Sequence, residues 1–184
     1  MLTSSVWRSG ARWWFSGGLL AGGLTSALCA VTLGSLLLRP ILPGVAPAVL
    51  VAVAFALVAS NELGLLRLRL PQNARQVPLS VVEEGARFGA LQFGFEMGTG
   101  LRTFMTSGLP HTLAIALMLI AGLPEGLLAG LGFGAGRAWM TLSRHAHRDH
   151  DGWDAQLVTF DRTVRLGLTA AAGVTLGVLT IHSF

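Results

Sequence analysis

The stretch WWFSGGLLAGGLTSALCAVTLGSLLL, residues 13–38, contains no charged side chain. A helix needs about 20 apolar residues to cross the hydrocarbon core of a bilayer, so this stretch is long enough to span a membrane. It is longer than the apolar region of a signal peptide, and no convincing Ala-x-Ala cleavage site follows it. We therefore predict an uncleaved first span, with Trp13 and Trp14 as anchors at the membrane interface.

The composition of the whole chain indicates the same class of protein. Hydrophobic residues make up 52% of the 184 residues and charged residues 12%, whereas soluble domains carry about 25% charged residues. A soluble domain of this length needs polar side chains to cover its surface, and this chain lacks them. We therefore expect lipid to be the solvent of the outer helix faces.

Other apolar segments predict further crossings. Arg39-Pro40 ends the first span, and Leu42-Pro43-Gly44 reverses the chain. The second span is expected at residues 45–66, followed by a polar loop at 66–87 with an amphipathic stretch. The last span is expected at 164–181, after the polar stretch SRHAHRDHDGWDAQLVTFDR, residues 143–162.

The apolar region 88–142 holds two crossings, but its division can be made in two ways. In one, a helix covers 88–107 and a long kinked helix covers 110–140. In the other, residues 88–122 form one crossing broken around Gly98–Pro110, and a second helix covers 124–142. Either division predicts an all-α, polytopic helical membrane bundle of about five transmembrane helices, forming a single transmembrane domain over residues 1–184.

Arginine positions set the orientation of these spans, because Lys and Arg accumulate in cytoplasmic loops. Eleven of the thirteen basic residues, all of them arginine, fall on one side if the N-terminus is cytoplasmic and the C-terminus outside. Arg39 alone falls outside, and Arg102 lies within an apolar region. The net charge of +4 therefore reflects topology, and we predict no nucleic-acid partner.

Glycines recur at four-residue spacing, which lets helix backbones approach closely in membranes. These positions are Gly18/Gly22, Gly94/Gly98 and Gly122/Gly126/Gly130/Gly134. We expect mainly tight packing within the chain. Contact with a second copy, or with a partner in a membrane complex, through one of these faces is the alternative.

Polar side chains within the apolar region predict an intramembrane site, because ionisable groups in hydrocarbon need partners or water. They are Glu96, Thr99, Arg102, Thr103, Thr106, Ser107 and His111. In a continuous helix, the threonines and Arg102 would form one polar stripe that Glu96 extends. The structural alternative is that Arg102 snorkels to the outer headgroups. Glu125, by contrast, is expected in an outer loop or in the first turn of a helix after Pro124, where a carboxylate is favourable.

A second candidate site is the polar segment before the last span. His145, His147, Asp149 and His150 have ligand types suited to zinc, nickel or cobalt at short spacing. The alternative is an ordinary solvated loop. The single cysteine, Cys29, allows no disulfide framework or CxxC pair, and we expect it to be a buried apolar filler. The chain also lacks P-loop, GxSxG and HExxH motifs, so we predict no enzymatic activity, and the cofactor stays unknown.

Residues 93–138, FGFEMGTGLRTFMTSGLPHTLAIALMLIAGLPEGLLAGLGFGAGRA, resemble part of the CcdA/DsbD-type membrane thiol-electron carriers. Gly134-Ala135-Gly136-Arg137 resembles the end of one family helix, and Gly108-Leu109-Pro110 the proline of its broken helix. MauE-like maturation proteins are similar to about the same degree. The chain departs from the first family by lacking its membrane cysteine pair, so the resemblance implies a related helical scaffold without a thiol relay.

These observations predict a multi-pass protein of a bacterial inner (cell) membrane. The leading hypothesis is a non-enzymatic accessory, maturation or carrier protein with a working site between Glu96 and His111. A small-solute or ion transporter that uses the broken helix is an alternative, since such helices hold ligands in known transporters. A structural subunit of a membrane complex is the other.

Overall fold

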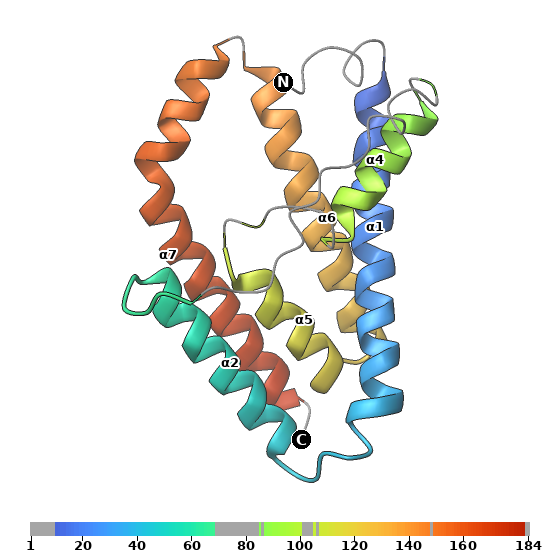
Figure 1. The fold of residues 1–184 in the computed structure, drawn as a ribbon, viewed down its shortest axis with the longest axis vertical. Helices are drawn as coiled ribbons and strands as arrows, with labels where there is room; N and C mark the ends of the chain where they lie inside the picture. Colours follow the sequence, from blue (N-terminus) through green and yellow to red (C-terminus); the bar gives the residue numbers. More distant parts are fainter. Residues whose placement is uncertain are drawn as a thin grey trace. The chain divides into compact units, whose positions relative to one another are not determined.

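The computed structural model describes residues 10–68, 85, 87–100, 105, 107–147 and 149–182. All regular secondary structure in this described part is helical, and it contains no strand. Figure 1 shows the helices, which are α1 Ala11–Leu33, the π-helix η1 Gly34–Leu38, α2 Ala46–Glu62, α4 Phe88–Gly98, α5 Leu109–Leu119, α6 Leu123–Ala146 and α7 His150–His182. The all-α prediction is confirmed for these residues.

Local sequence explains where several helices begin and end. Pro47 and Pro110 occupy the first turns of α2 and α5, where a proline has no helical hydrogen bond to lose. Gly44 has a positive φ of 55° in the turn before α2, a conformation that glycine adopts without steric cost. Glu125 lies in the first turn of α6, as predicted, where the helix dipole favours a carboxylate.

The helix boundaries decide between the two divisions of residues 88–142. The helix α4 ends at Gly98, α5 covers Leu109–Leu119, and α6 begins at Leu123 next to Pro124. The predicted long kinked helix over 110–140 is therefore wrong, because the chain leaves α5 at Ile120 and restarts at Leu123. The boundaries match the alternative with a break between Gly98 and Pro110 and a new helix near 124.

The last helix corrects another prediction. Whereas a polar connection was expected up to residue 162, α6 continues to Ala146 and α7 begins at His150. Polar residues do not prevent a helix when their side chains reach solvent, and Asp151 in the first turn of α7 suits its dipole. The last helix therefore begins about 14 residues before the expected span at 164–181.

The described residues form two compact units made of alternating chain segments. The first unit contains α1 up to Ala27, α4 and the part of α6 from Leu127. The second contains the rest of α1, η1, α2, α5 and α7 from Asp151. Each unit is described separately below.

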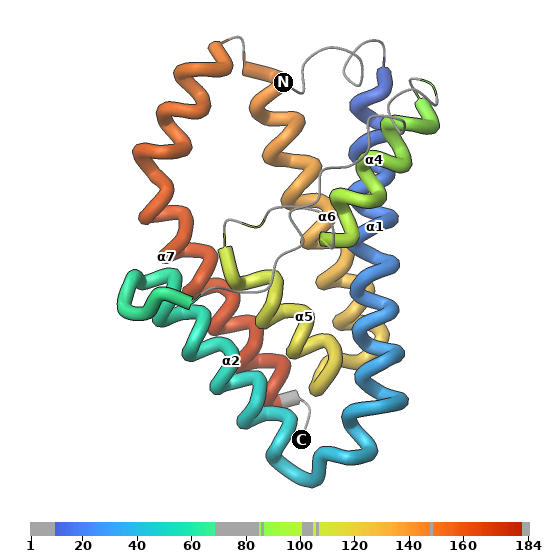
Figure 2. The backbone as a smooth tube through the Cα atoms, viewed as in Figure 1, coloured from blue at the N-terminus to red at the C-terminus, as the bar shows by residue number. Residues whose placement is uncertain are grey.

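In the first unit, α1 packs against α4 through glycines on both helices. Figure 2 shows the two helices side by side. A Cβ on Gly18 would lie 2.1 Å from the Leu91 carbonyl oxygen, and one on Gly94 would lie 2.1 Å from the Phe15 oxygen. A Cβ on Gly22 would lie 2.3 Å from the Phe95 oxygen, and one on Gly98 would lie 2.4 Å from the Leu19 oxygen. These distances leave no room for any side chain.

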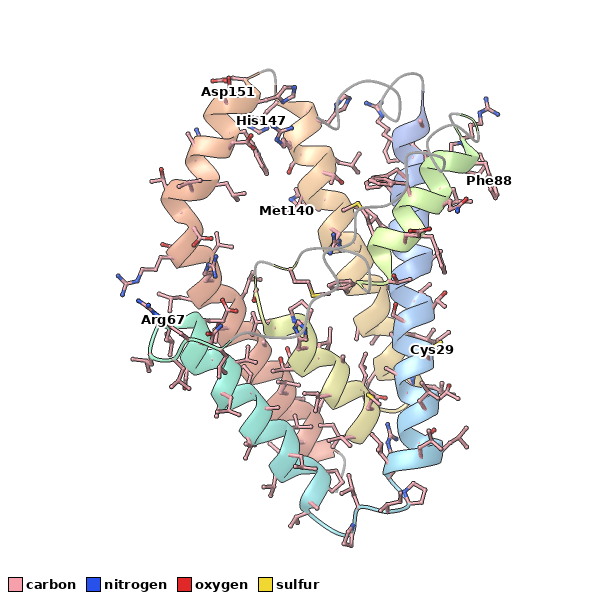
Figure 3. The ribbon with its side chains drawn as sticks, viewed as in Figure 1. Cys29, Arg67, Phe88, Met140, His147 and Asp151 are labelled. Atoms are coloured by element: carbon pink, nitrogen blue, oxygen red, sulfur yellow. The ribbon has the colours of Figure 1, made fainter. Side chains whose placement is uncertain are left out.

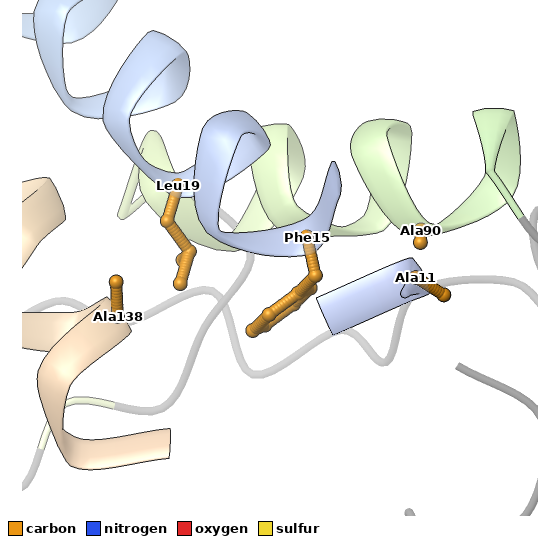
Figure 4. Close-up of a cluster of buried hydrophobic side chains, with 5 residues drawn as sticks. All are labelled: Ala11, Phe15, Leu19, Ala90 and Ala138. Atoms are coloured by element: carbon orange, nitrogen blue, oxygen red, sulfur yellow. The ribbon is translucent and has the colours of Figure 1, made fainter. Parts of the chain in front are cut away.

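A second face of α1 packs against α6 in the same way. A Cβ on Gly23 would lie 2.4 Å from the Gly130 oxygen, and one on Gly134 would lie 2.6 Å from the Leu19 oxygen. The prediction that the glycine spacing serves tight internal packing is thus confirmed for these positions. Figure 4 shows the apolar cluster beside them, formed by Ala11, Phe15, Leu19, Ala90 and Ala138.

In the second unit, α2 and η1 pack against α5, and α7 contributes to the same core. The buried cluster is made of Val51, Ala116, Leu119 and Leu176, from three different helices. Gly173 of α7 lies beside the Phe55 ring of α2, with 3.0 Å from the ring to the position of a Cβ. Small residues of α7 thus accept a large side chain of α2.

Two helices, Ala11–Leu38 and His150–Ile181, are long and apolar enough to cross a membrane. Only 11% of the apolar stretch of the second helix is buried within the chain, so most of this stretch faces outward. Large apolar side chains such as Val158 and Ile181 are more than three-quarters exposed. Soluble monomers rarely expose apolar surface on this scale.

Candidate functional site: a carboxylate at the start of helix α5

The most constrained polar group of the second unit is the carboxylate of Glu62, the last residue of α2. Its side chain is only 3% exposed. Its Oε1 accepts a hydrogen bond of 2.7 Å from the backbone N–H of Gly108 and one of 3.0 Å from the Ser107 hydroxyl. The carboxylate therefore binds the residues that begin α5.

The sequence around Gly108 explains why a carboxylate binds there. The first N–H groups of a helix have no partner within the helix, and the helix dipole makes this end positive. Gly108 is the N-cap residue and has no side chain to satisfy them, while Pro110 has no N–H to offer. Ser107 caps one group locally, accepting from the Leu109 N–H at 3.2 Å. Glu62 supplies the remaining acceptor and a negative charge.

Arg165 of α7 completes the cluster. Its Nη1 lies 3.3 Å from Oε2 of Glu62, and its Nε donates to Oδ2 of Asp161, one turn earlier, at 2.8 Å. The Arg165 side chain is 36% exposed and that of Asp161 55% exposed. Arg165 therefore connects a buried carboxylate with an accessible one, and charged groups from two helices, α2 and α7, meet at the start of α5.

The opposite end of α5 is bound by the opposite charge. Arg39, directly after η1, donates from Nε to the Met118 oxygen at 3.1 Å and from Nη2 to the Leu117 oxygen at 3.0 Å. Nη2 also donates to the oxygen of Ala121. These carbonyls are acceptors that the end of a helix leaves unpaired, and a cation there matches the dipole. This contact gives a structural role to the arginine that departs from the positive-inside distribution.

The two contacts make α5 a short helix with a charged side chain at each end. Hydrogen bonds and charge contacts of this kind are stronger where water is excluded than in bulk water. Groups of this kind can hold an ionic ligand, exchange partners or fix a helix in place.

The described residues of the predicted intramembrane site lie on two different helices. Glu96 lies half-buried in α4, and Thr99 is the C-cap residue of that helix. The Thr99 hydroxyl donates to the Glu96 oxygen at 2.7 Å, and the Thr99 oxygen accepts from the Ser26 hydroxyl of α1 at 3.0 Å. His111 lies in the first turn of α5. Arg102, Thr103 and Thr106 lie outside the described residues.

The expected continuous polar stripe is not formed where it should begin. A stripe at helical spacing requires the helix to continue past Thr99, but α4 ends at Gly98. Gly100 has a φ of 71°, which ends right-handed helix geometry. Thr99 therefore serves as a backbone connection between α4 and α1 in the first unit.

The predicted metal ligands are not brought together. Among the described residues, which include His145, His147, Asp149 and His150, no group of three potential ligands is close enough to hold an ion. The Nδ1 of His147 lies 3.1 Å from the Ser143 oxygen, and that of His150 lies 3.0 Å from the Arg144 oxygen. Both rings contact the backbone of α6, and Figure 3 shows His147 at its C-terminal end.

Sequence reasoning did not select Glu62, Arg165 or Arg39 as site residues. Two sequence signals are consistent with the role of Glu62. It is an ionisable residue inside the expected span 45–66, and the pattern Ser107-Gly108-Leu109-Pro110 is typical of a helix start that needs an acceptor. The positive-inside rule singles out Arg39 as an exception, but its partner in α5 is visible only in three dimensions. The prediction that Cys29 is buried is wrong, because its side chain is exposed on α1.

No protein-family model matches the chain, and neither a curated protein nor a solved structure matches it significantly.

Proposed function

We propose that the chain is a multi-pass membrane protein with five crossings, its N-terminus cytoplasmic and its C-terminus outside. Two helices of 28 and 32 residues, each with a long apolar stretch, support the first and last crossings, since about 20 residues suffice. Apolar α2 supports another. The helices α4 and α5 have 11 residues each, and a helix that short reaches only about 16 Å. We therefore count them as the two halves of one broken crossing.

The proposed orientation rests on the arginine distribution and on the contact of Arg39. The positive-inside rule leaves Arg39 as the one loop arginine on the outer side. Arg39 donates three hydrogen bonds to carbonyls at the C-terminal end of α5 and just after it. These bonds give a reason for an arginine at this position that does not depend on topology. The exception thus no longer weighs against the orientation.

The proposed role is that of a non-enzymatic carrier, and more specifically of a small-solute or ion transporter. The observation that carries this choice is the buried Glu62 carboxylate at the start of the half-helix α5, paired with Arg165. Ionisable groups inside membrane proteins mark substrate and ion pathways, and broken helices with charged ends place such groups near the midplane. The CcdA-like resemblance adds a helical carrier scaffold without thiol chemistry.

Flux measurements on reconstituted protein test this role. Purified protein in liposomes is assayed for current on addition of inorganic ions, amino acids and small carboxylates. We expect a substrate-dependent current that Glu62→Gln reduces at least about tenfold, because the neutral amide loses the charge contact with Arg165. Thr159→Ala is the control, since its exposed hydroxyl donates within α7, to the Ala155 oxygen at 2.9 Å, and it is expected to retain current.

The accessory and structural roles make different predictions. A maturation protein or a subunit of a complex would give no current with any of these solutes and would purify with a fixed partner from native membranes. That combination of results would replace the transporter proposal with one of these alternatives.

A further inference from the structure

Arg39 uses only part of its guanidinium to bind the end of α5. A guanidinium has five N–H donors in one plane, one on Nε and two on each Nη. Nε donates to the Met118 oxygen, and Nη2 donates to the oxygens of Leu117 and Ala121. These bonds occupy the edge that Nε and Nη2 form. The two donors of Nη1 lie outside that edge and have no acceptor among the described residues.

The Nη1 atom of Arg39 is accessible. The residue as a whole is half-buried. Its Nη1 is not among the fully buried nitrogen and oxygen atoms that lack a hydrogen bond, so an Nη1 without an acceptor must reach the surface of the second unit. A donor of a charged group is costly to bury without a partner, and at the surface it can bind water or a ligand.

The charge of Arg39 is incompletely balanced by the chain. In the part that the structure describes, Arg39 forms no ion pair, whereas Arg165 has two carboxylate partners. Glu125, in the first turn of α6, follows Ala121 closely along the chain but forms no ion pair with Arg39. The C-terminal end of a helix supplies about half an elementary negative charge, so about half of the arginine charge stays uncompensated at this surface.

Large apolar side chains on both sides of Arg39 in the sequence face outward. Those that are more than half exposed include Leu36, Leu37 and Ile41. Leu38, by contrast, packs against the apolar cluster of the second unit. An accessible cation between exposed apolar residues matches a phospholipid, which combines an anionic phosphate with apolar chains. A free anion would match the guanidinium but not the apolar side chains.

We propose that Nη1 of Arg39 binds the phosphate of a membrane phospholipid, whose acyl chains lie against Leu36, Leu37 and Ile41. One planar guanidinium then joins a lipid to the end of α5, because Nε and Nη2 keep their carbonyls while Nη1 donates to the phosphate oxygens. The phosphate supplies the negative charge that the chain does not. The inference rests on the proposed crossings, which place Arg39 where the first span leaves the bilayer, and it does not rest on transport.

Lipid-dependent thermal stability tests the site in the full-length protein, delipidated in an uncharged detergent. The probes are dioleoyl phosphatidylglycerol, dioleoylglycerol, which has the same chains without phosphate, and inorganic phosphate, which has no chains. Each is added to the intact protein, to Arg39→Gln, to Arg12→Gln and to the double variant Leu37→Ser/Ile41→Ser. Arg12 is the matched control, because it is an exposed arginine at the other end of α1 that stacks on Trp13 and forms no ion pair among the described residues.

We expect saturating phosphatidylglycerol to raise the melting temperature of the intact protein by at least about 5 °C, and dioleoylglycerol or inorganic phosphate by less than about 2 °C. Arg39→Gln and the double variant should each lose at least about half of the shift, whereas Arg12→Gln should keep it. The readout is the shift on adding lipid, so the lower starting stability of Arg39→Gln does not enter. The double variant retains Arg39 and its bonds to α5, and it replaces Arg39→Gln if that variant does not fold.

Three results would overturn the lipid site. They are an unchanged shift in Arg39→Gln, equal losses in Arg39→Gln and Arg12→Gln, and a shift with dioleoylglycerol or inorganic phosphate as large as that with phosphatidylglycerol. Flux in liposomes without an Arg39-dependent shift would keep the transporter and reject the lipid site. An Arg39-dependent shift without flux would reject the transporter and keep the lipid site.

Discussion

The two units of this chain hold their helices together by different kinds of contact. In the first, α1 meets α4 and α6 through positions that have no side chain, and carbonyl oxygens lie where a Cβ would be. In the second, α5 is fixed by charged side chains, Glu62 at its start and Arg39 at its end. The contacts of the first unit depend on glycine, whereas the second unit combines charged contacts with a close approach of Gly34 to the Met118 backbone.

This difference teaches where each unit can change. Backbones in van der Waals contact cannot accept even a methyl group without moving a whole helix, so the first unit is rigid to substitution. Charged contacts at a helix end can be weakened in steps, by removing the charge, the hydrogen bonds or the side chain. We expect mutations to act abruptly in the first unit and in graded fashion in the second.

The largest effect is expected from Gly18→Ala in the first unit. The new Cβ would lie 2.1 Å from the Leu91 oxygen and 2.7 Å from the Phe95 nitrogen. No side-chain rotation can relieve a contact with backbone, so α4 has to move, and we expect a loss of about 3 kcal/mol or more. Thermal unfolding in detergent measures it.

Gly132→Ala on α6 is the matched control for that substitution. A Cβ at Gly132 has nothing within 4 Å. Alanine has the higher helix propensity, so the variant should be neutral or slightly more stable. If Gly18→Ala and Gly132→Ala had the same stability, the close contact of α1 with α4 would be refuted.

The next largest effect is expected from Arg39→Ala in the second unit. The substitution leaves two carbonyls of α5 and that of Ala121, just after it, without this donor. We expect a loss of about 2–3 kcal/mol, since hydrogen bonds to charged groups contribute more than neutral ones. Arg39→Lys keeps the charge at the helix end but not the planar set of donors, so about half the loss should return. A lysine variant no more stable than the alanine variant would contradict the graded behaviour.

A smaller effect is expected from Ser26→Ala, again in the first unit. The Ser26 hydroxyl contacts both the Gly22 oxygen of its own helix at 2.8 Å and the Thr99 oxygen at 3.0 Å. Because the hydroxyl has a single proton to share, we expect a loss of only about 0.5–1 kcal/mol. Thr25→Ala is the control, as its exposed hydroxyl donates only within α1. A loss above that of Arg39→Ala would reverse the comparison between the units.

The smallest effect is expected from Cys29→Ser. Cys29 is exposed on α1 and lies in neither apolar cluster. A serine there can donate to a carbonyl of its own helix. We therefore expect the free energy of unfolding in detergent to change by no more than about 0.5 kcal/mol. Complete loss of function in this variant would point to an intermolecular thiol mechanism.

Apolar length alone was enough to predict much of the fold. The segment 13–38 carries its whole signal in one uncharged run, and α1 with η1 covers it. The break before Pro110 was also recognisable as one of two alternatives. The start of α7 was missed, because residues 150–162 are polar and polarity distinguishes membrane from water, not helix from loop.

The site was less accessible from the sequence for a physical reason. Glu62 and Gly108 are 46 residues apart, and Arg39 and Met118 are 79 apart. Local spacing rules describe neighbours on one helix, and they grouped Glu96 with Thr99 because both lie in one segment. Charges that bind the ends of another helix leave no periodic signal along the chain.

The membrane topology is tested most directly by reporters that read which side of the membrane they occupy. We propose insertions at Gly44, Asn73, Gly122 and His147 and a fusion after Phe184, each expressed in bacterial membranes. Five crossings predict outside, cytoplasm, outside, cytoplasm and outside, in that order. A cytoplasmic signal at Gly122 would show that α4 and α5 do not form one broken crossing, and a cytoplasmic signal after Phe184 would contradict the proposed orientation.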